Sequence, residues 1–164
     1  MPMPFAVRDV LIADAQGPSV PIHLVAEGAR LADVAGLTQV QTAWLDAQRF
    51  NGAQRRAVLL PGADGAIAGV VLGIGNGRGD PCGPAALLVG QLAAQLPAGA
   101  YHVAGLTGAD AETAAIAFTL GAYRFRRYKT GDSEPHPRLK LPAGVSLDRI
   151  VSIAEAIWLG RDLI

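Results

Sequence analysis

A glycine-rich run from Gly73 to Gly79 is the part of this sequence whose composition could bind a phosphate group. It follows an apolar stretch of strand type, and glycines after a strand let backbone N–H groups approach a phosphate. The spacing does not fit a dinucleotide-binding fingerprint, because Arg78 and Asp80 occupy the positions that need a small residue. No Lys-Ser or Lys-Thr pair follows, as a P-loop requires. We therefore interpret the run mainly as a connection, with phosphate binding as the alternative.

Residues that could bind a metal or attack a substrate are few and scattered. The histidines His23, His102 and His136 lack the paired spacing of a zinc site. Cys82 has no histidine near it in the sequence, which favours a thiol in a loop or in the core over a nucleophile. No serine has a Gly-x-Ser-x-Gly setting, and no carboxylates have the context of a glycosidase or metal site. We therefore expect no catalytic or metal-binding residue in this chain.

A local cluster of positive charge lies near the end of a predicted helix and consists of Arg124, Arg126, Arg127 and Lys129. Aromatic residues are interleaved with it, so the cluster could contact the phosphates of a nucleic acid. Cations near a helix C-terminus also complement the helix dipole, and aromatic rings anchor such a turn to the core. The second explanation is favoured, and nucleic-acid binding is kept as a minor alternative.

The composition predicts one compact domain, because 51% of the 164 residues are hydrophobic and only 17% are charged. A chain of this length buries roughly 70% of its unfolded surface without help from disulfides or metal. The 14 basic and 14 acidic residues cancel, so no overall field attracts nucleic acid or anionic lipid. Apolar stretches such as Val70–Ile74 are far shorter than the roughly 20 residues that cross a membrane. The lone Cys82 favours the reducing cytoplasm.

Short apolar runs alternate along the chain with segments of helical spacing. The predicted strands are Val10–Ala15, Pro21–Ala26, Ala57–Leu60, Ala66–Ile74, Tyr101–Leu106 and an edge strand at Arg138–Leu141. The predicted helices are Leu37–Phe50, Ala85–Leu96, a helix capped within Thr107–Asp110 that runs to about Tyr128, and a terminal helix from Ser146. This alternation is typical of a layered α/β domain.

Two finer expectations concern burial. In the first helix, Val40, Ala43, Trp44 and Ala47 recur at helical spacing and predict its apolar stripe. The turn Gly62–Gly65 predicts a hairpin between the third and fourth strands, whose near-continuous apolarity implies burial on both faces.

The terminal helix has the strongest helical pattern. Ser146 is its expected N-cap, and its apolar face is formed by Leu147, Ile150, Val151, Ala154, Ile157 and Trp158. No glycine or proline stop follows Arg161, and the last two residues, Leu163 and Ile164, are apolar. We therefore expect the natural polypeptide to continue beyond this chain.

Two segments together resemble the leucyl aminopeptidase (cytosol aminopeptidase) family of metallopeptidases. The run Tyr123–Lys129 resembles the stretch that closes a helix in that family, and Leu159–Ile164 is similar to the end of its inter-domain helix, which normally precedes an Asn-Thr-Pro motif. Leu59–Gly62 and Val71–Gly75 resemble paired strands of its smaller N-terminal domain. The resemblance covers about Ala57 to Ile164.

This resemblance implies a three-layer α/β/α, macro-domain-like fold with a mixed, mostly parallel sheet. Residues 1–145 would be the N-terminal domain, and residues 146–164 the helix that leads to a missing C-terminal catalytic domain. In the family that second domain holds two divalent metal ions, zinc or manganese, and removes N-terminal amino acids from peptides. The parent would be a cytoplasmic hexamer, and this fragment is expected to be inactive by itself. The implied domain junction consists of Trp158, Arg161, Asp162, Leu163 and Ile164.

Two alternatives belong to other classes of protein. A free-standing macro-like module could hold ADP-ribose or a related phosphate ligand in the loop Gly73–Gly79. A nucleic-acid docking domain would use the basic cluster Arg124–Lys129.

Overall fold

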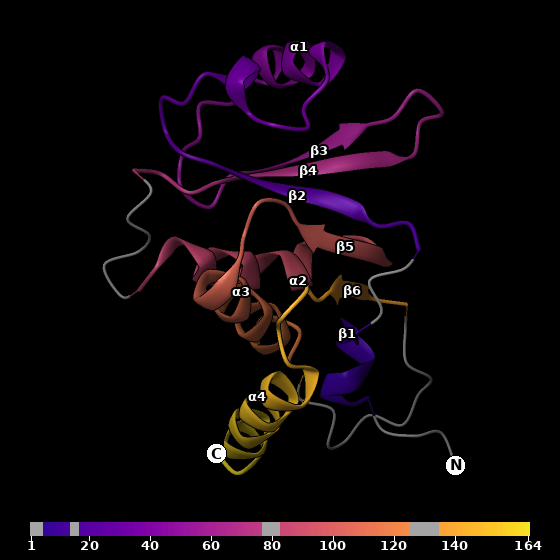
Figure 1. The fold of residues 1–164 in the computed structure, drawn as a ribbon, viewed down its shortest axis with the longest axis vertical. Coiled ribbons are helices and arrows are strands. Elements are labelled where there is room, and N and C mark those ends of the chain that lie inside the picture. The colour runs from indigo at the N-terminus through magenta and orange to yellow at the C-terminus, as the bar shows by residue number, and fades with distance from the viewer. Residues whose placement is uncertain (1–4, 14–16, 77–82, 125–134) are drawn as a thin grey trace.

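The computed structural model describes residues 5–13, 17–76, 83–124 and 135–164. Within them the chain forms a six-stranded sheet in the order β1-β6-β5-β2-β4-β3 (Figure 1). The strands are β1 (Leu11–Ile12), β2 (Val20–Val25), β3 (Ala57–Pro61), β4 (Ile67–Gly73), β5 (Gly99–Val103) and β6 (Pro137–Lys140). Every neighbouring pair is parallel except β3 and β4, which are antiparallel. The expected mixed, mostly parallel sheet is therefore confirmed.

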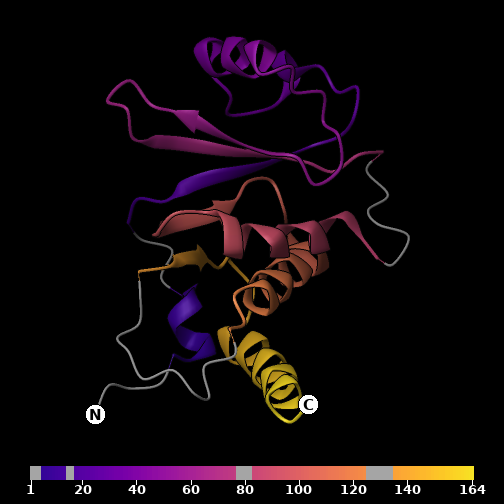
Figure 2. The same ribbon diagram turned by 180° about the vertical axis from the view of Figure 1, so that it is seen from behind.

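Helices cover both faces of this sheet, as the two opposite views show (Figures 1 and 2). The α-helices are α1 (Gln39–Ala47), α2 (Leu92–Gln95), α3 (Gly108–Gly121) and α4 (Leu147–Asp162), and the 3-10 helices are η1 (Val7–Val10), η2 (Leu31–Asp33) and η3 (Ala85–Gln91). In β4, Val70 and Leu72 belong to one core and Val71 to another, because successive side chains of a strand point to opposite faces. The sheet therefore lies between two layers of helices, which gives the expected three-layer arrangement.

The larger core lies between the sheet and the layer of η3, α3 and α4. Its largest fully buried side chains include Tyr101, Phe118 and Ile150, from β5, α3 and α4. Burial of one such side chain contributes about 1.5–3 kcal/mol, so this layer accounts for much of the stability.

The close packing of η3 against α3 depends on two glycines. A Cβ atom on Gly121 would lie 1.9 Å from the carbonyl oxygen of Gly90, and one on Gly90 would lie 2.7 Å from that of Ala117. The expected α-helix at Ala85–Leu96 is here a 3-10 helix followed by a single α-helical turn. Glycine is a weak α-helix former, and Gly90 is used for backbone contact with α3 instead.

The smaller core lies under α1 and consists of Val25, Leu45, Phe50, Leu60 and Val71. Helix α1 is confirmed, and Thr38 caps its first turn by accepting a hydrogen bond from the Gln41 N–H at 3.3 Å.

The stripe predicted for α1 is wrong, since Leu45 is its one buried residue. The side chains of Val40 and Trp44 are 75% and 41% exposed. Trp44 instead donates its indole N–H to the Leu59 carbonyl, at 3.2 Å, and so occupies an acceptor on the edge strand β3. A side chain that occupies a backbone acceptor on an edge strand protects the sheet from pairing with other chains.

The strand predictions need three corrections. The expected strand at Val10–Ala15 is reduced to β1, preceded by η1, and residues 14–16 lie outside the described part. The hairpin of β3 and β4 is confirmed, but β3 is an edge strand with Leu59 41% exposed, so it is not buried on both faces. The expected edge strand at Arg138–Leu141 is β6, which lies inside the sheet because β1 pairs with its outer side.

The helix predicted to run from Thr107 to about Tyr128 is also shorter in the structure. Its N-cap is Thr107, as expected, but α3 ends at Gly121 and the next residues through Arg124 are not helical. Residues 125–134 lie outside the described part. Gly121 is a weak helix former, and it permits the close approach of η3 at this point.

Candidate functional site

Three residues in the described part of the glycine run, Gly73, Ile74 and Gly75, do not offer their backbone N–H groups to a phosphate. The backbone N–H groups of Gly73, Ile74 and Gly75 already donate to carbonyl oxygens of the protein at 2.8, 2.9 and 3.0 Å. A Cβ atom on Gly73 would lie 2.1 Å from the carbonyl oxygen of Ala53, so this glycine allows two backbone segments to touch. An anion site at such a loop needs N–H groups that point at the ligand. Residues 77–82 of the run lie outside the described part.

The basic cluster can be followed only at its first member. Arg124 is exposed beyond the end of α3. Arg126, Arg127 and Lys129 lie outside the described residues.

Two histidines that are far apart in the sequence come together on the face of the sheet that α1 also covers. The pairing of β2 with β5 places His102 opposite Pro21, so His23 and His102 project from the same face. Ser19 Oγ lies 2.8 Å from His102 Nδ1. Burial lowers the pKa of His23, and the neighbouring His102 lowers it further. Burial also lowers the pKa of His102, with a smaller effect from Lys140.

This histidine pair was missed in the sequence because only strand pairing brings it together. Both pKa values lie below the ordinary value for histidine, which favours the neutral imidazoles. Over the described residues, no three His, Cys, Asp or Glu side chains gather in a way that could hold a metal ion. The pair is therefore a polar patch on the sheet rather than a recognisable metal or nucleophile site.

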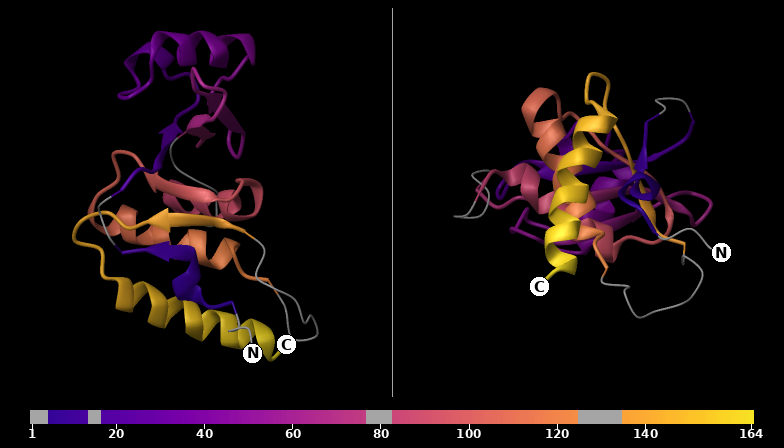
Figure 3. Two further views of the ribbon diagram at one scale, coloured as in Figure 1. Left: turned by 90° about the vertical axis from the view of Figure 1, so that its right-hand side faces the viewer. Right: turned by 90° about the horizontal axis from the view of Figure 1, so that it is seen from below.

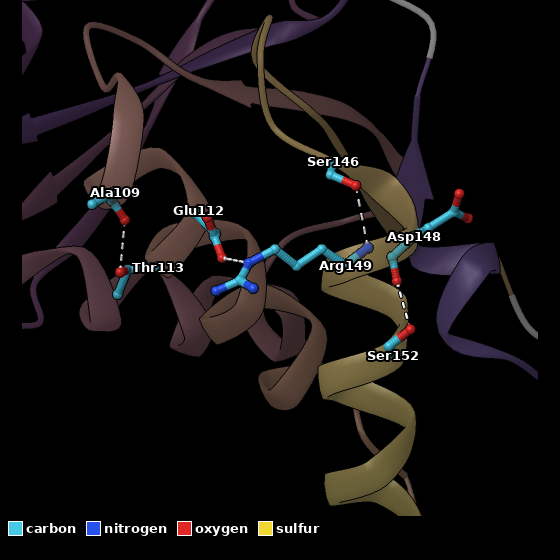
Figure 4. A network of polar contacts seen from close by, with 7 residues as sticks. All are labelled: Ala109, Glu112, Thr113, Ser146, Asp148, Arg149 and Ser152. Carbon is cyan, nitrogen blue, oxygen red and sulfur yellow. Dashed lines mark hydrogen bonds and ion pairs between the residues drawn. The ribbon is translucent and has the colours of Figure 1, made fainter.

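The beginning of α4 is tied to neighbouring elements by polar contacts (Figure 4). Ser146 Oγ accepts a hydrogen bond from the Arg149 N–H at 3.3 Å, which confirms the predicted N-cap. The Arg149 guanidinium forms an ion pair with Glu112 of α3. Asp148 pairs with Arg8 of η1 at 2.7 Å, but both side chains are largely exposed and such pairs contribute little.

Of the residues expected at a domain junction, Trp158 is held by this domain itself. Its indole N–H donates to the Thr119 carbonyl of α3 at 3.1 Å. Its ring is stacked on Phe5 with centroids 5.7 Å apart and meets the edge of Tyr123 at 5.6 Å. These contacts fix the last turns of α4 against the domain.

Arg161 and Asp162 are held in the same way, and both contact Tyr123. Arg161 donates to the Leu120 carbonyl at 3.0 Å, and its guanidinium carbon lies 5.3 Å from the centre of the Tyr123 ring. Asp162 accepts a hydrogen bond of 2.7 Å from the Tyr123 hydroxyl. This hydrogen bond is the main cause of the raised pKa of Tyr123.

The remaining expected junction residues face outward. Leu163 is 75% exposed and Ile164 is fully exposed at the end of the chain. Figure 3 shows α4 along the outside of the molecule, with the C-terminus at its free end. The structure thus divides the five residues into three that anchor α4 and two that are largely exposed. Ile157, expected from the sequence to lie on the core side of this helix, is 37% exposed, so that expectation was wrong.

None of the described helices is both long and apolar enough to cross a membrane.

Comparisons with known proteins agree with the arrangement of this sheet and its helices. The family of the M17 aminopeptidase N-terminal domain matches residues 20–142. The cytosol aminopeptidase from Coxiella burnetii is similar in structure, with a TM-score of 0.78 and 24% identity over 94% of this chain and 33% of that chain. A mutant of tomato leucine aminopeptidase gives a TM-score of 0.53 and 18% identity over 92% and 35%. The bottromycin maturation enzyme BotP, in complex with Mn, gives 0.57 and 22% over 88% and 31%.

The chain spans about a third of the length of the solved structures it matches. No curated protein sequence matches it. At these identities the similarity to solved structures concerns the fold, whereas the family match concerns the sequence of most of the chain.

Proposed function

Because the chain belongs to the family of M17 aminopeptidase N-terminal domains, we propose that it is the accessory domain of a metal-dependent, leucyl-type aminopeptidase that removes N-terminal residues from peptides. The observation that carries this proposal is the family match over residues 20–142, together with solved aminopeptidases of which this chain covers about a third. The chemistry would belong to a C-terminal domain of the parent polypeptide.

The metal ions of that reaction belong to the other domain in this proposal. When bound, two divalent ions such as zinc or manganese activate a water molecule and polarise the scissile carbonyl. Support for such a requirement comes from BotP, which is described in complex with Mn. The donor set in this chain does not fit such a centre, because no three suitable side chains gather among its described residues.

The contribution proposed for this chain is mechanical. In this proposal residues 1–145 are the body of the domain and residues 146–164 are the connecting helix, and α4 (Leu147–Asp162) would be the main part of that helix. Polar contacts fix α4 at its start through Arg149 and near its end through Trp158 and Arg161. A helix held at both ends transmits the orientation of one domain to the next, and the domain can also take part in subunit contacts of a hexamer.

A cytoplasmic location is proposed with this function. Its support is the single cysteine, Cys82, in a chain of 164 residues, because disulfide-bonded cysteines are typical of oxidising compartments.

The test compares two polypeptides from the same gene. The 164-residue chain and the full-length product are purified and assayed for release of leucine from a leucyl substrate, with Mn²⁺ or Zn²⁺ supplied. We expect metal-dependent hydrolysis by the full-length product and none by the 164-residue chain. A gene that encodes nothing beyond Ile164, or a full-length product without peptidase activity, would refute the proposal.

A further inference from the structure

The basic side chains of the described strands all project from one face of the sheet. These strands contain no Asp or Glu, and their basic residues are His23, His102, Arg138 and Lys140. Their neighbours Ile22, Val103 and Leu139 belong to the larger core, so alternation along each strand sends the basic side chains to the opposite face. The strands therefore give this face cationic and titratable groups without a carboxylate.

Helix α1 covers only part of this face. It packs on β3 at one end of the sheet, whereas β6 and β1 lie at the other end (Figure 1). The smaller core beneath α1 takes its strand residues from β2, β3 and β4 and none from β5 or β6. On those two strands His102 and Lys140 are partly exposed. A small ligand can therefore reach this part of the face.

Four polar side chains of this face gather around β5. Strand pairing places His102 of β5 between Ser19, which precedes β2, and His23 along β2. The pairing of β5 with β6 places Lys140 next to His102 on its other side. We refer to these residues as the histidine site, which consists of Ser19, His23, His102 and Lys140.

Much of the hydrogen-bonding capacity of the histidine site is unused within the described residues. His23 is only 5% exposed and forms no hydrogen bond with any of them. His102 Nδ1 lies 2.8 Å from Ser19 Oγ, and its Nε2 has no partner among them. Lys140 donates to the Gly17 carbonyl at 2.7 Å and forms no ion pair with a described residue, so its other N–H groups are available.

The unused nitrogens of His23 point to a ligand. A buried polar group without a partner is costly, and native proteins rarely keep one that neither water nor a ligand satisfies. No fully buried side-chain nitrogen or oxygen of the described residues lacks a partner, so the free nitrogens of His23 reach the surface. They are therefore accessible to a small ion although the side chain as a whole is buried.

The loop before α1 holds the His23 ring in place. A Cβ atom on Gly36 would lie 3.0 Å from His23 Cε1 and 3.9 Å from each ring nitrogen. The loop thus faces the carbon between the two nitrogens and leaves the nitrogens on either side of the contact. Gly36 has a φ of +89°, a conformation that favours glycine. Packing therefore fixes this ring, as a binding site requires.

The charges around the two imidazoles favour an anion over a metal cation. Burial and His102 lower the pKa of His23, and burial and Lys140 lower the pKa of His102. No carboxylate of the described residues is among these causes, and Asp33 of η2 and Asp46 of α1 are exposed. Neutral imidazoles also bind transition metals, but a divalent cation here would be repelled by Lys140 with no described carboxylate to balance it. An anion would be attracted by the same ammonium group and would accept the unused N–H groups.

We propose that the histidine site binds a small oxyanion with the chemistry of phosphate, free or as a monoester. The Lys140 ammonium supplies the positive charge. With the Ser19 hydroxyl donating to Nδ1 of His102, Nε2 of that ring carries the proton and donates to the anion. A bound anion favours protonation of both imidazoles, so its affinity increases as the pH falls. This inference does not depend on the proposed function.

The experiment titrates the 164-residue chain with sodium sulfate at several pH values and follows the imidazole signals of His23 and His102 by NMR. Sulfate keeps its charge over the range in which histidine titrates, so a pH dependence of binding belongs to the protein. We expect saturable shifts of both signals and tighter binding at lower pH. Lys140→Gln should weaken binding roughly tenfold, because a hydrogen bond between charged groups is lost.

The matched control is Arg149→Gln, which removes the same charge from α4 on the other side of the sheet and should leave the affinity unchanged. Ser19→Ala is a second site variant and should also weaken binding. Circular dichroism checks that each variant is folded, so that loss of binding is not confused with unfolding.

Sodium chloride at the same ionic strength separates binding from screening. Shifts that chloride reproduces, or an equal effect of Lys140→Gln and Arg149→Gln, overturn the inference. Saturable shifts with Zn²⁺ and none with sulfate assign the imidazoles to a metal and also overturn it. Inorganic phosphate and phenyl phosphate then distinguish the two forms of the ligand. Tighter binding of the ester supports a phosphate monoester, and tighter binding of inorganic phosphate supports the free anion.

Discussion

The crossing of η3 and α3 offers the sharpest test of how this fold is held together. Replacement of Gly121 by alanine adds one methyl group at the point where a Cβ atom would lie 1.9 Å from the Gly90 carbonyl oxygen. Real Cβ contacts are rarely closer than about 3 Å, so the two segments must separate by roughly 1 Å. Neither neighbour can yield by a simple side-chain rotation, since the obstructing atoms belong to the backbone.

The magnitude follows from two opposing contributions. Overpacking of a well-packed core costs typically about 1–3 kcal/mol, and a backbone clash belongs at the upper end. The greater helix propensity of alanine returns at most about 1 kcal/mol. We expect Gly121→Ala to lower the free energy of unfolding by about 2 kcal/mol, which corresponds to a fall in Tm of about 4–8 °C for a domain of this size.

The matched control is Gly160→Ala in the same chain. Nothing lies near the added methyl group in this domain, so only the helix propensity changes, and stability should rise by about 0.5–1 kcal/mol. Urea denaturation followed by circular dichroism measures both variants under the same conditions. If the two substitutions shift the midpoint equally, or Gly121→Ala stabilises the chain, the assignment of the Gly90 crossing as a backbone contact is refuted.

Three further predictions concern other parts of the domain. The free energy of unfolding should fall as the pH decreases below about 6.5. The pKa values of His23 and His102 are lowered in the folded state, so the unfolded state binds more protons in this pH range. Urea titrations at several pH values measure this dependence, which His102→Gln should weaken. Thr38→Ala removes the α1 cap and should cost about 1 kcal/mol in the same assay, whereas an unchanged midpoint would show that the cap contributes nothing. Phe118→Ala should cost about 3–5 kcal/mol, measured as a lower denaturation midpoint, since this side chain is fully buried.

Local signals in the sequence predicted much of the fold. The turn Gly62–Gly65 between apolar runs correctly indicated the hairpin of β3 and β4, and Ser146 correctly indicated the start of α4. Helical spacing also found α1, but it could not tell which side faces the sheet. Trp44 was predicted to lie on the apolar stripe of that helix, but its indole N–H has a partner at the sheet edge that only the tertiary structure provides.

The candidate junction shows the same limit at the level of single residues. The sequence predicted Trp158 on the apolar side of the terminal helix, and its ring is packed as an apolar residue should be. The sequence could not show that Tyr123 meets both Arg161 and Asp162, because that contact requires the end of α3 to lie beside the end of α4. The resemblance therefore predicted five junction residues without distinguishing the three that pack on this domain from the two that are exposed.

The pairing of β1 with β6 determines the order in which this domain can be completed during synthesis. Leu11 pairs with Leu139, so β1 has no partner in the sheet until most of this domain has been synthesised. At about 5–20 residues per second this delay lasts roughly ten seconds, during which Val7, Val10 and Leu11 lack the complete burial that they have in the folded domain. Pairings this distant along the chain also slow folding, because a long loop must close first. Among the described strands of this domain, β1 is therefore the earliest to be synthesised and among the last to be incorporated into the sheet.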